Sequence, residues 1–166
     1  MALTQDNLKS RLHYNAETGI FTWIATTSYK RKHVLGKPAG YRHSSGYILI
    51  NIDKKLYKAH RLAWLYVYGH FPELSIDHID RDGCNNALSN LRLATHSQNM
   101  MNTKARSDST SGHKNIWLDK RRNRWLVVIT AAKKKRQFGP YKTIDEAIKN
   151  RDAKLRQLHG EFARVA

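Results

Sequence analysis

The sequence predicts an α+β protein built from two modules. Two short apolar segments, 75–78 and 91–94, flank a loop rich in glycine and asparagine, a pattern typical of paired antiparallel strands. Thr95 is a suitable N-cap for a helix directly after the second segment. Near the C-terminus, three strand-like segments, 115–119, 124–130 and 136–141, precede an amphipathic helix that begins with the capping box Thr143-Ile144-Asp145-Glu146. The small, polar stretch 104–112 separates these elements from the rest and indicates a linker.

The composition indicates a protein that binds a polyanion. Its 166 residues include 30 lysines and arginines against 13 aspartates and glutamates, a formal net charge of +17. Nucleic acid is the usual partner for such an excess. An anionic membrane is disfavoured, because no apolar run has the length needed to cross lipid.

Cysteine usage and the start of the chain favour a reducing compartment. Cys84 is the single cysteine, which excludes an internal disulfide and a cysteine-rich zinc site. The first residues lack the basic start and apolar core of a secretory signal. We therefore expect a cytoplasmic protein that is not secreted and has no disulfide partner.

The positive charge is unevenly distributed. Residues 104–166 carry 17 basic and 6 acidic side chains, a net charge of +11. Between His70 and Asn99, by contrast, four side chains are acidic and only two are basic. This predicts a locally acidic pocket, suited to a cation, within a basic protein.

The stretch from Leu74 to Asn102 carries the chemistry. A strand–strand–helix hook over this stretch would gather one carboxylate, one imidazole and two amides: Asp77, His78, Asn90 and Asn99. Carboxylate and amide oxygens suit a hydrated Mg²⁺ or Mn²⁺ ion, which can neutralise a phosphate. A neutral imidazole can take a proton from an attacking water, and a side-chain amide can hold its other ring nitrogen. This inventory is typical of metal-assisted phosphodiester cleavage.

At these residues the chain resembles the HNH endonuclease family, in particular its phage and intron-homing branch. The matching pieces are Ala59-His60-Arg61-Leu62-Ala63, Asp77-His78-Ile79-Asp80, Asn90-Leu91-Arg92 and Ser97-Gln98-Asn99. The resemblance implies a ββα-metal fold with its core at about residues 57–102 and one divalent ion, Mg²⁺ or Mn²⁺, per active site.

The resemblance also implies a role for each residue. Asp77 and Asn99 would bind the metal, His78 would be the general base, and Asn90 would orient it. Asn99 stands where some family members carry a third histidine. His60 and Arg61 would lie close to the catalytic centre, with the alternative that His60 packs at a helix start while Arg61 is a surface charge.

Further elements are expected before this core. The sequence predicts a helix over 6–13, a strand over 20–24 and a hairpin joining 46–52 to 55–58 through Asp53-Lys54. The run 61–69 is helical in composition and ends at a glycine.

The C-terminal module resembles the DNA-binding domain of the apetala-two/ethylene-response-factor family. The resemblance covers residues 111–162 and rests on Trp117, Arg124-Trp125, Phe138-Gly139-Pro140-Tyr141, Glu146-Ala147 and His159-Gly160-Glu161-Phe162. It implies a three-stranded antiparallel sheet that enters the major groove of DNA and packs on one helix. The candidate DNA contacts are Trp117, Arg121, Arg122, Arg124, Trp125, Lys133, Lys134, Lys135 and Arg136. One of the two tryptophans alternatively packs under the helix.

These observations predict a two-module DNA endonuclease. Its domains would be an HNH nuclease at 1–103, a linker at 104–112 and a DNA-binding domain at 113–166, with double-stranded DNA as the partner. The alternative is a non-catalytic DNA-binding regulator that retains a decayed nuclease domain. The sequence leaves the target site and the choice between monomer and weak dimer open.

Overall fold

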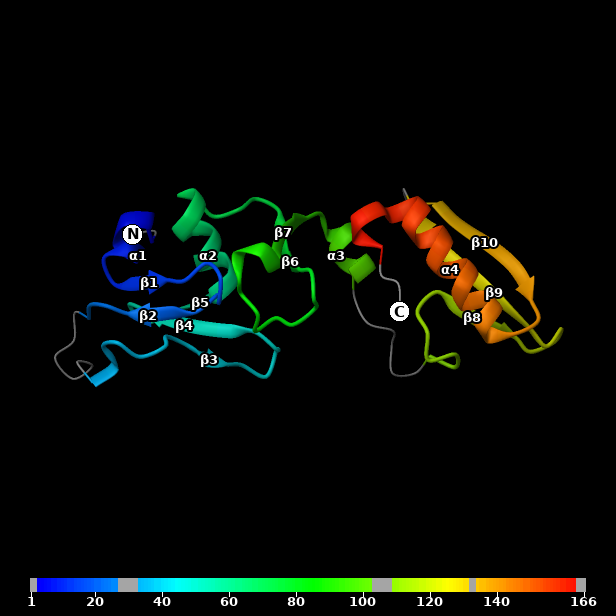
Figure 1. Ribbon diagram of the computed structural model, residues 1–166, viewed down its shortest axis with the longest axis horizontal. Helices are drawn as coiled ribbons and strands as arrows, with labels where there is room; N and C mark the ends of the chain where they lie inside the picture. The colour runs from blue at the N-terminus through cyan, green and yellow to red at the C-terminus, as the bar shows by residue number, and fades with distance from the viewer. Residues whose placement is uncertain (1–2, 27–32, 103–108, 132–133, 164–166) are drawn as a thin grey trace. The chain divides into compact units, whose positions relative to one another are not determined.

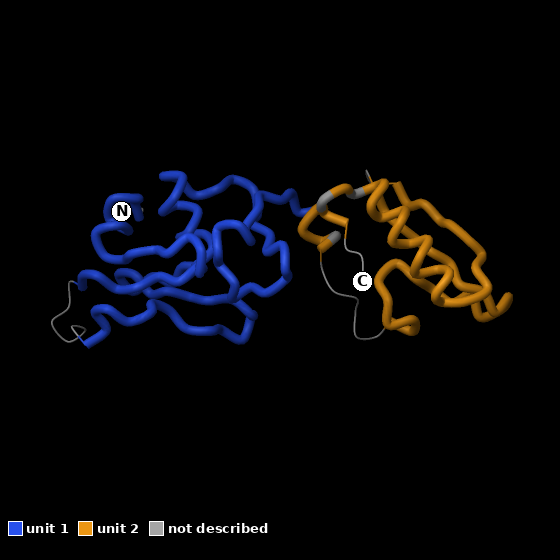
Figure 2. The backbone as a smooth tube through the Cα atoms, in the orientation of Figure 1, with its two compact units in different colours: residues 1–96 blue, residues 97–166 orange. Residues whose placement is uncertain are grey.

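The computed structural model describes residues 3–26, 33–102, 109–131 and 134–163. The chain forms two compact units, residues 1–96 and residues 97–166, drawn in blue and orange in Figure 2. The boundary follows His96, so Asn99 belongs to the second unit. No helix in the described ranges combines the length and apolar character needed to cross a membrane.

The described residues of the first unit form three small antiparallel sheets and two α-helices (Figure 1). In chain order its elements are α1 (Gln5–Lys9), β1 (Leu12–Tyr14), β2 (Phe21–Trp23), β3 (Tyr41–Arg42), β4 (Ile48–Ile52), β5 (Lys55–Lys58), α2 (Ala59–Tyr68), β6 (Ser75–His78), the 3₁₀ turn η2 (Leu88–Asn90) and β7 (Leu91–Ala94). The sheets pair β1 with β2, order β3-β4-β5, and pair β6 with β7.

The second unit places one helix on a three-stranded antiparallel sheet (Figure 1). Its elements are α3 (His96–Asn102, starting one residue before the boundary), β8 (Ile116–Asp119), β9 (Arg124–Ala131), β10 (Lys134–Tyr141), α4 (Ile144–His159) and the 3₁₀ turn η3 (Gly160–Phe162). The strand order is β10-β9-β8. This confirms the predicted sheet-on-helix architecture, although β10 begins two residues before the expected Arg136.

The predicted helix over 6–13 is wrong in its second half. α1 ends at Lys9, and Leu12 already pairs with Trp23 in a strand. Leu8 and Leu12 are four residues apart, which also fits a helix face, but Tyr14 is two residues beyond Leu12 and is buried as well. Residues two apart lie on the same face in a strand but not in a helix. The burial of both Leu12 and Tyr14 therefore favours the strand β1 over a longer helix.

The other expected elements of the first unit are present. Asp53 and Lys54 both have positive φ, 50° and 63°, as a two-residue hairpin turn between β4 and β5 requires. Gly69 ends α2 with φ 82°, and its N–H donates to the Leu65 carbonyl. The core places α2 against β4 and the β6–β7 pair through Ile50, Leu62, Ile76 and Leu91.

In the second unit, apolar side chains of the sheet and of α4 share one core. Ile116, Val127 and Ile129 pack with Ala147 and Leu155. The Thr143 hydroxyl accepts a hydrogen bond from the Glu146 N–H at 3.2 Å, which confirms the predicted helix cap. The sheet therefore buries one face under α4 and exposes the other.

Candidate functional site

The β6–β7 pair forms as the sequence predicts and places two neighbouring polar residues at its end. Asp77 lies opposite Arg92, and His78 lies opposite Leu91. Both polar side chains are buried, with exposed fractions of 4% for Asp77 and 6% for His78. A buried carboxylate and a buried imidazole are costly unless they are paired, so the partners of each define the site.

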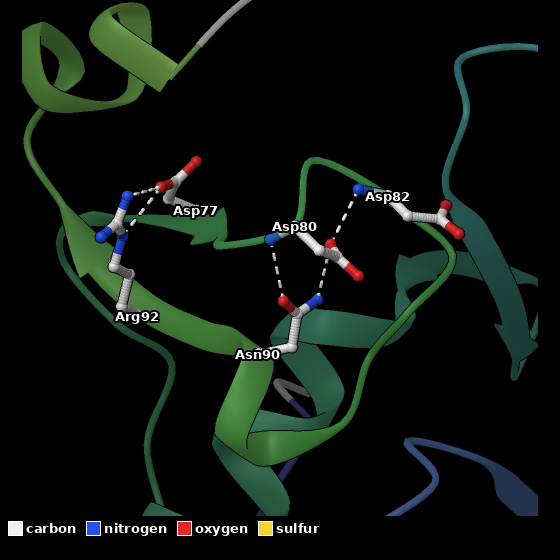
Figure 3. Close-up of polar contacts among 5 residues, drawn as sticks. All are labelled: Asp77, Asp80, Asp82, Asn90 and Arg92. Carbon is white, nitrogen blue, oxygen red and sulfur yellow. Dashed lines mark hydrogen bonds and ion pairs between the residues drawn. The ribbon is translucent and has the colours of Figure 1, made fainter. Parts of the chain in front are cut away.

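Arg92 pairs with Asp77 across the two strands. Its Nε lies 2.9 Å and its terminal nitrogen 2.8 Å from Oδ2 of Asp77, so both guanidinium contacts use one carboxylate oxygen (Figure 3). The pair follows directly from the strand register, because directly opposed residues point to the same face. The guanidinium compensates the buried negative charge and fixes the orientation of the carboxylate.

The His78 imidazole lies among two other rings and one amide. The His60 ring is edge-on to the His78 ring, with 4.9 Å between the ring centroids and an interplanar angle of 85°. The centroid of the Tyr47 ring lies 5.9 Å from that of His78. Nε2 of His78 is 3.3 Å from Oδ1 of Asn86. The rings of Tyr47 and His60 also pack against each other, with 5.2 Å between their centroids. Strand β6, helix α2 and the β3–β4 connection thus all contribute to the surroundings of His78.

Burial keeps both histidines neutral at neutral pH. It lowers the pKa of His60 to about 3, with smaller contributions from the nearby His78, Lys58 and Arg61. Burial also lowers the pKa of His78, and it outweighs the Asn86 hydrogen bond and the negative charges of the neighbouring aspartates, which act in the opposite direction. A neutral imidazole is the form that accepts a proton.

The loop after β6 is closed by a network centred on Asp80 (Figure 3). Asn90 donates from Nδ2 to Oδ1 of Asp80 at 2.9 Å and accepts from the Asp80 N–H at 3.0 Å. It also donates to the Asn85 carbonyl at 2.8 Å. The Asp82 N–H donates to the same Asp80 oxygen at 2.8 Å. Asn90 therefore joins the two ends of the loop.

In the structure, Asn90 has partners other than the His78 ring. Its amide is used by Asp80 and Asn85, whereas the amide next to the His78 ring is that of Asn86. The reason is local: Asn90 ends the 3₁₀ turn η2, where its side chain meets the backbone at the start of the loop. Asn86 reaches the imidazole from inside the loop.

His60 and Arg61 are separated by the structure although they are neighbours in sequence. His60 is buried beside His78, and its Nδ1 has no hydrogen-bond partner. Arg61 instead lies over the Phe71 ring at 5.5 Å and donates to the Pro72 carbonyl at 3.4 Å. Of this pair only His60 belongs to the surroundings of His78.

The predicted metal ligands have the donor chemistry of a hard divalent ion. Asp77 offers a carboxylate, and Asn99, on α3 in the second unit, offers an amide oxygen. Oxygen donors of this kind fit Mg²⁺ or Mn²⁺. Within the described residues, no group of three or more His, Cys, Asp or Glu side chains is arranged to hold a metal.

The predicted DNA contacts fall on different faces of the β8–β10 sheet. Trp117 is 64% exposed and points away from α4, because its neighbour Ile116 is in the core. Arg124 and Lys135 share that outer face by register, being opposite Asp119 and Thr130.

The remaining predicted contacts lie elsewhere. Trp125 packs against the core under α4, which decides the alternative left open by the sequence. The exposed Arg121 and Arg122 are in the β8–β9 turn. Lys134 and Arg136 are exposed but alternate to the other side of β10 from Lys135. Lys133 lies outside the described residues.

Sequence reasoning missed two residues of the His78 surroundings, Asn86 and Tyr47. Asn86 follows another asparagine in a polar loop, and both suit a turn equally well. Its near-complete burial, at 2% exposed, separates it from Asn85. Tyr47 precedes β4 and reads as part of an ordinary hairpin strand.

One family model covers the central motif, and several known proteins are similar to the chain. The HNH endonuclease family matches residues 57–101. Protein 3.8 of Escherichia phage T7 is 37% identical over 115 residues, covering 67% of this chain and 94% of the phage protein. An uncharacterized HNH endonuclease of Acanthamoeba polyphaga mimivirus is 28% identical, covering 87% of this chain and 74% of its own length. The solved structure of the HNH homing endonuclease I-HmuI, reported for its DNA binding and cleavage, gives a TM-score of 0.44 at 21% identity over 90% of this chain and 85% of that chain.

Proposed function

Because the chain belongs to the HNH endonuclease family, we propose that it is a metal-dependent enzyme that hydrolyses phosphodiester bonds in double-stranded DNA. The observation that carries this proposal is a buried, neutral imidazole directly beside a buried carboxylate, His78 next to Asp77. Each group has the state that the chemistry requires: a proton acceptor and a hard oxygen donor.

His78 is the proposed general base. The oxygen of an attacking water forms a bond to phosphorus while its proton passes to the His78 imidazole. The bond from phosphorus to the 3′ oxygen breaks, which leaves a 5′-phosphate and, once the departing oxygen is protonated, a 3′-hydroxyl. The packing of His60 and Tyr47 against His78 limits rotation of the base during this step.

Asp77 and Asn99 are the proposed ligands of one Mg²⁺ or Mn²⁺ ion. When bound, the ion supplies charge neutralisation at the scissile phosphate and at the departing oxygen. Asp77 has its carboxylate already oriented by Arg92. The role of Asn99 is supported by its position in the sequence motif.

The second unit is the proposed DNA reader. Its outer sheet face combines an exposed aromatic ring, Trp117, with the charges of Arg124 and Lys135. Arg121 and Arg122 extend the charge into the neighbouring turn. Basic side chains of this kind contact phosphates, while base edges are read from the grooves. The resemblance to the apetala-two/ethylene-response-factor domain supports the same face.

The test is cleavage of supercoiled plasmid and linear phage DNA by the full chain, with Mg²⁺, with Mn²⁺ and with excess chelator. Asp77→Ala should require more metal for half-maximal cleavage, whereas His43→Ala, which alters an exposed imidazole bonded to Ser45, should cleave like wild type. Cleavage that persists in chelator contradicts the metal requirement. DNA binding without cleavage under every metal condition would instead support the regulator alternative.

A further inference from the structure

The Asn86 side chain has only one possible orientation. Its Nδ2 donates to the Cys84 carbonyl at 3.0 Å, and a carbonyl can only accept. The opposite end of the amide, Oδ1, therefore faces Nε2 of His78 at 3.3 Å. Exchanging the two amide atoms would place an acceptor against the Cys84 carbonyl and leave the Asn86 donor without that partner.

This orientation assigns the proton on the His78 ring. Oδ1 of Asn86 is an acceptor, so the hydrogen bond at Nε2 requires Nε2 to carry hydrogen. In a neutral imidazole the other nitrogen, Nδ1, then has a lone pair and no proton. The ring is buried and lies against Tyr47 and His60.

Asn86 is itself held firmly by parts of the chain distant in sequence. Its backbone carbonyl accepts a hydrogen bond from the Tyr14 hydroxyl at 2.7 Å. Gly19 packs so closely against it that an added Cβ would lie 2.2 Å from the Asn86 carbonyl carbon. The β1–β2 hairpin thus supports the loop from which Asn86 reaches His78.

We propose that Asn86 is the positioning residue of the general base: it accepts the hydrogen bond from Nε2 of His78 and directs the Nδ1 lone pair to take up the proton of the attacking water. This deepens the proposed function and rests on it for the catalytic step. The assignment of the proton to Nε2 rests on the hydrogen-bond geometry alone. Asn90, by contrast, acts on the loop through Asp80.

Two variants of similar size separate this role from simple packing. Both variants lose the Nδ2 donor to the Cys84 carbonyl, so they differ at Nε2: Asn86→Asp keeps an acceptor oxygen for it, whereas Asn86→Leu keeps the approximate volume and removes the acceptor. Loss of an outer partner of a catalytic ligand typically costs about 10–100-fold. We expect Asn86→Leu to lower kcat by about that factor with DNA affinity nearly unchanged, and Asn86→Asp to retain more activity.

The deciding measurement is nitrogen-15 NMR of the metal-free full chain with labelled histidine, using His78→Gln to assign the signals. We expect the wild-type proton of His78 on Nε2, protected from exchange, and the same in Asn86→Asp. In Asn86→Leu this protection should be lost. A wild-type proton on Nδ1, or an Asn86→Leu variant with unchanged protection and kcat, overturns the proposal.

The result remains decisive in less favourable cases. If Asn86→Leu does not fold, the site of the proton in the wild type and in Asn86→Asp still decides. If the wild type cleaves no DNA, the proposed function fails, while the NMR spectrum separately shows whether Asn86 holds the His78 ring.

Discussion

At the scale of single residues, the site places the neutral, buried ring of His78 next to charged side chains. His78 follows Asp77 and lies near Asp80 and Asp82, whose charges favour its protonated form. Burial outweighs them, and the pKa of His78 is lowered. The proposed base is therefore a neutral ring with carboxylates for neighbours.

His78→Ala should abolish most cleavage and leave DNA binding intact. The imidazole acts on water, and loss of a general base typically costs about 10²–10⁴-fold in rate. Single-turnover cleavage and a binding titration in chelator measure the two effects separately. A rate within a few fold of wild type would remove His78 from the mechanism.

His60 should make the chain sensitive to mild acid. Its pKa in the folded state is about 3, below the ordinary value of 6.5, so the unfolded state binds more protons between these values. Stability is therefore full above about pH 6.5 and falls as the pH decreases toward 3. At pH 5 the loss from this group is roughly 2 kcal/mol, at about 1.4 kcal/mol for each pH unit.

The matching variant is His60→Phe, which keeps a ring against His78 and cannot be protonated. Its unfolding midpoint should fall less than that of wild type between pH 7.5 and pH 5. His43→Phe, at an exposed histidine, serves as the control. Equal acid sensitivity in wild type and His60→Phe would show that other groups cause the loss.

At the scale of elements, the β6–β7 pair depends on the β1–β2 hairpin. Gly19, between β1 and β2, has φ +73°, and its backbone lies against Asn86 and Ala87. The nearby Tyr14 hydroxyl binds the Asn86 carbonyl. The loop that carries Asn86 is thus supported by a hairpin far away in sequence.

Gly19→Ala should destabilise the first unit and lower activity. An added Cβ would lie 2.2 Å from the Ala87 nitrogen, a clash with backbone that requires the loop to move. Gly36→Ala is the matched control, because Gly36 has φ +75° and nothing within 4 Å of the added carbon. Both should show the cost of a left-handed backbone, about 1–2 kcal/mol, and Gly19→Ala a further 1–3 kcal/mol or so.

Chemical unfolding of the two variants tests this difference. Equal midpoints for Gly19→Ala and Gly36→Ala would mean that the loop yields without strain. In that case close packing of Gly19 does not hold Asn86, and the Tyr14 hydrogen bond is the support that the hairpin gives.

The sequence predicted those elements whose signals are local. The bounds of β6 and β7, the turn at Asp53-Lys54 and the cap at Thr143 follow from short patterns and match the structure. The first helix was predicted too long because Leu8 and Leu12 fit a helix as well as a helix–strand junction.

The site was predictable in its motif but not in its contacts. Asp77 and His78 are recognisable from their place at the end of a strand. Both Asn86 and Asn90 are buried, and the choice between them as the partner of His78 depends on which amide reaches the ring. For Asn86 that position follows from packing against Gly19 and Tyr14 far away in sequence. No short pattern contains this information.

At the scale of the whole molecule, positive charge is concentrated outside the nuclease motif. Residues 104–166 carry a net charge of +11 of the total +17. Each phosphate contact made by a basic side chain contributes roughly 0.9 to the slope of log affinity against log salt. DNA binding should therefore depend strongly on salt. Variants that lower the slope identify the basic side chains that contact phosphates, and so the face on which the DNA lies.

The outer face of the β8–β10 sheet should account for a measurable part of that slope. Exchanging Arg124 and Lys135 for glutamine removes two charges from this face, and exchanging Lys149 and Arg156 for glutamine removes two exposed charges from α4. Net charge changes equally in both double variants. Only the first should flatten the salt dependence, by roughly 1.8 if both side chains contact phosphate.

Trp117→Ala completes this comparison because the ring carries no charge. It should weaken binding at every salt concentration and leave the slope unchanged. The slope reports counterions that are released when basic side chains contact phosphates, and the tryptophan ring releases none. Fluorescence anisotropy with one duplex over a series of salt concentrations measures all three variants. Equal slopes in the two double variants would place the DNA away from the outer face, and the second unit would then contribute charge without reading the sequence.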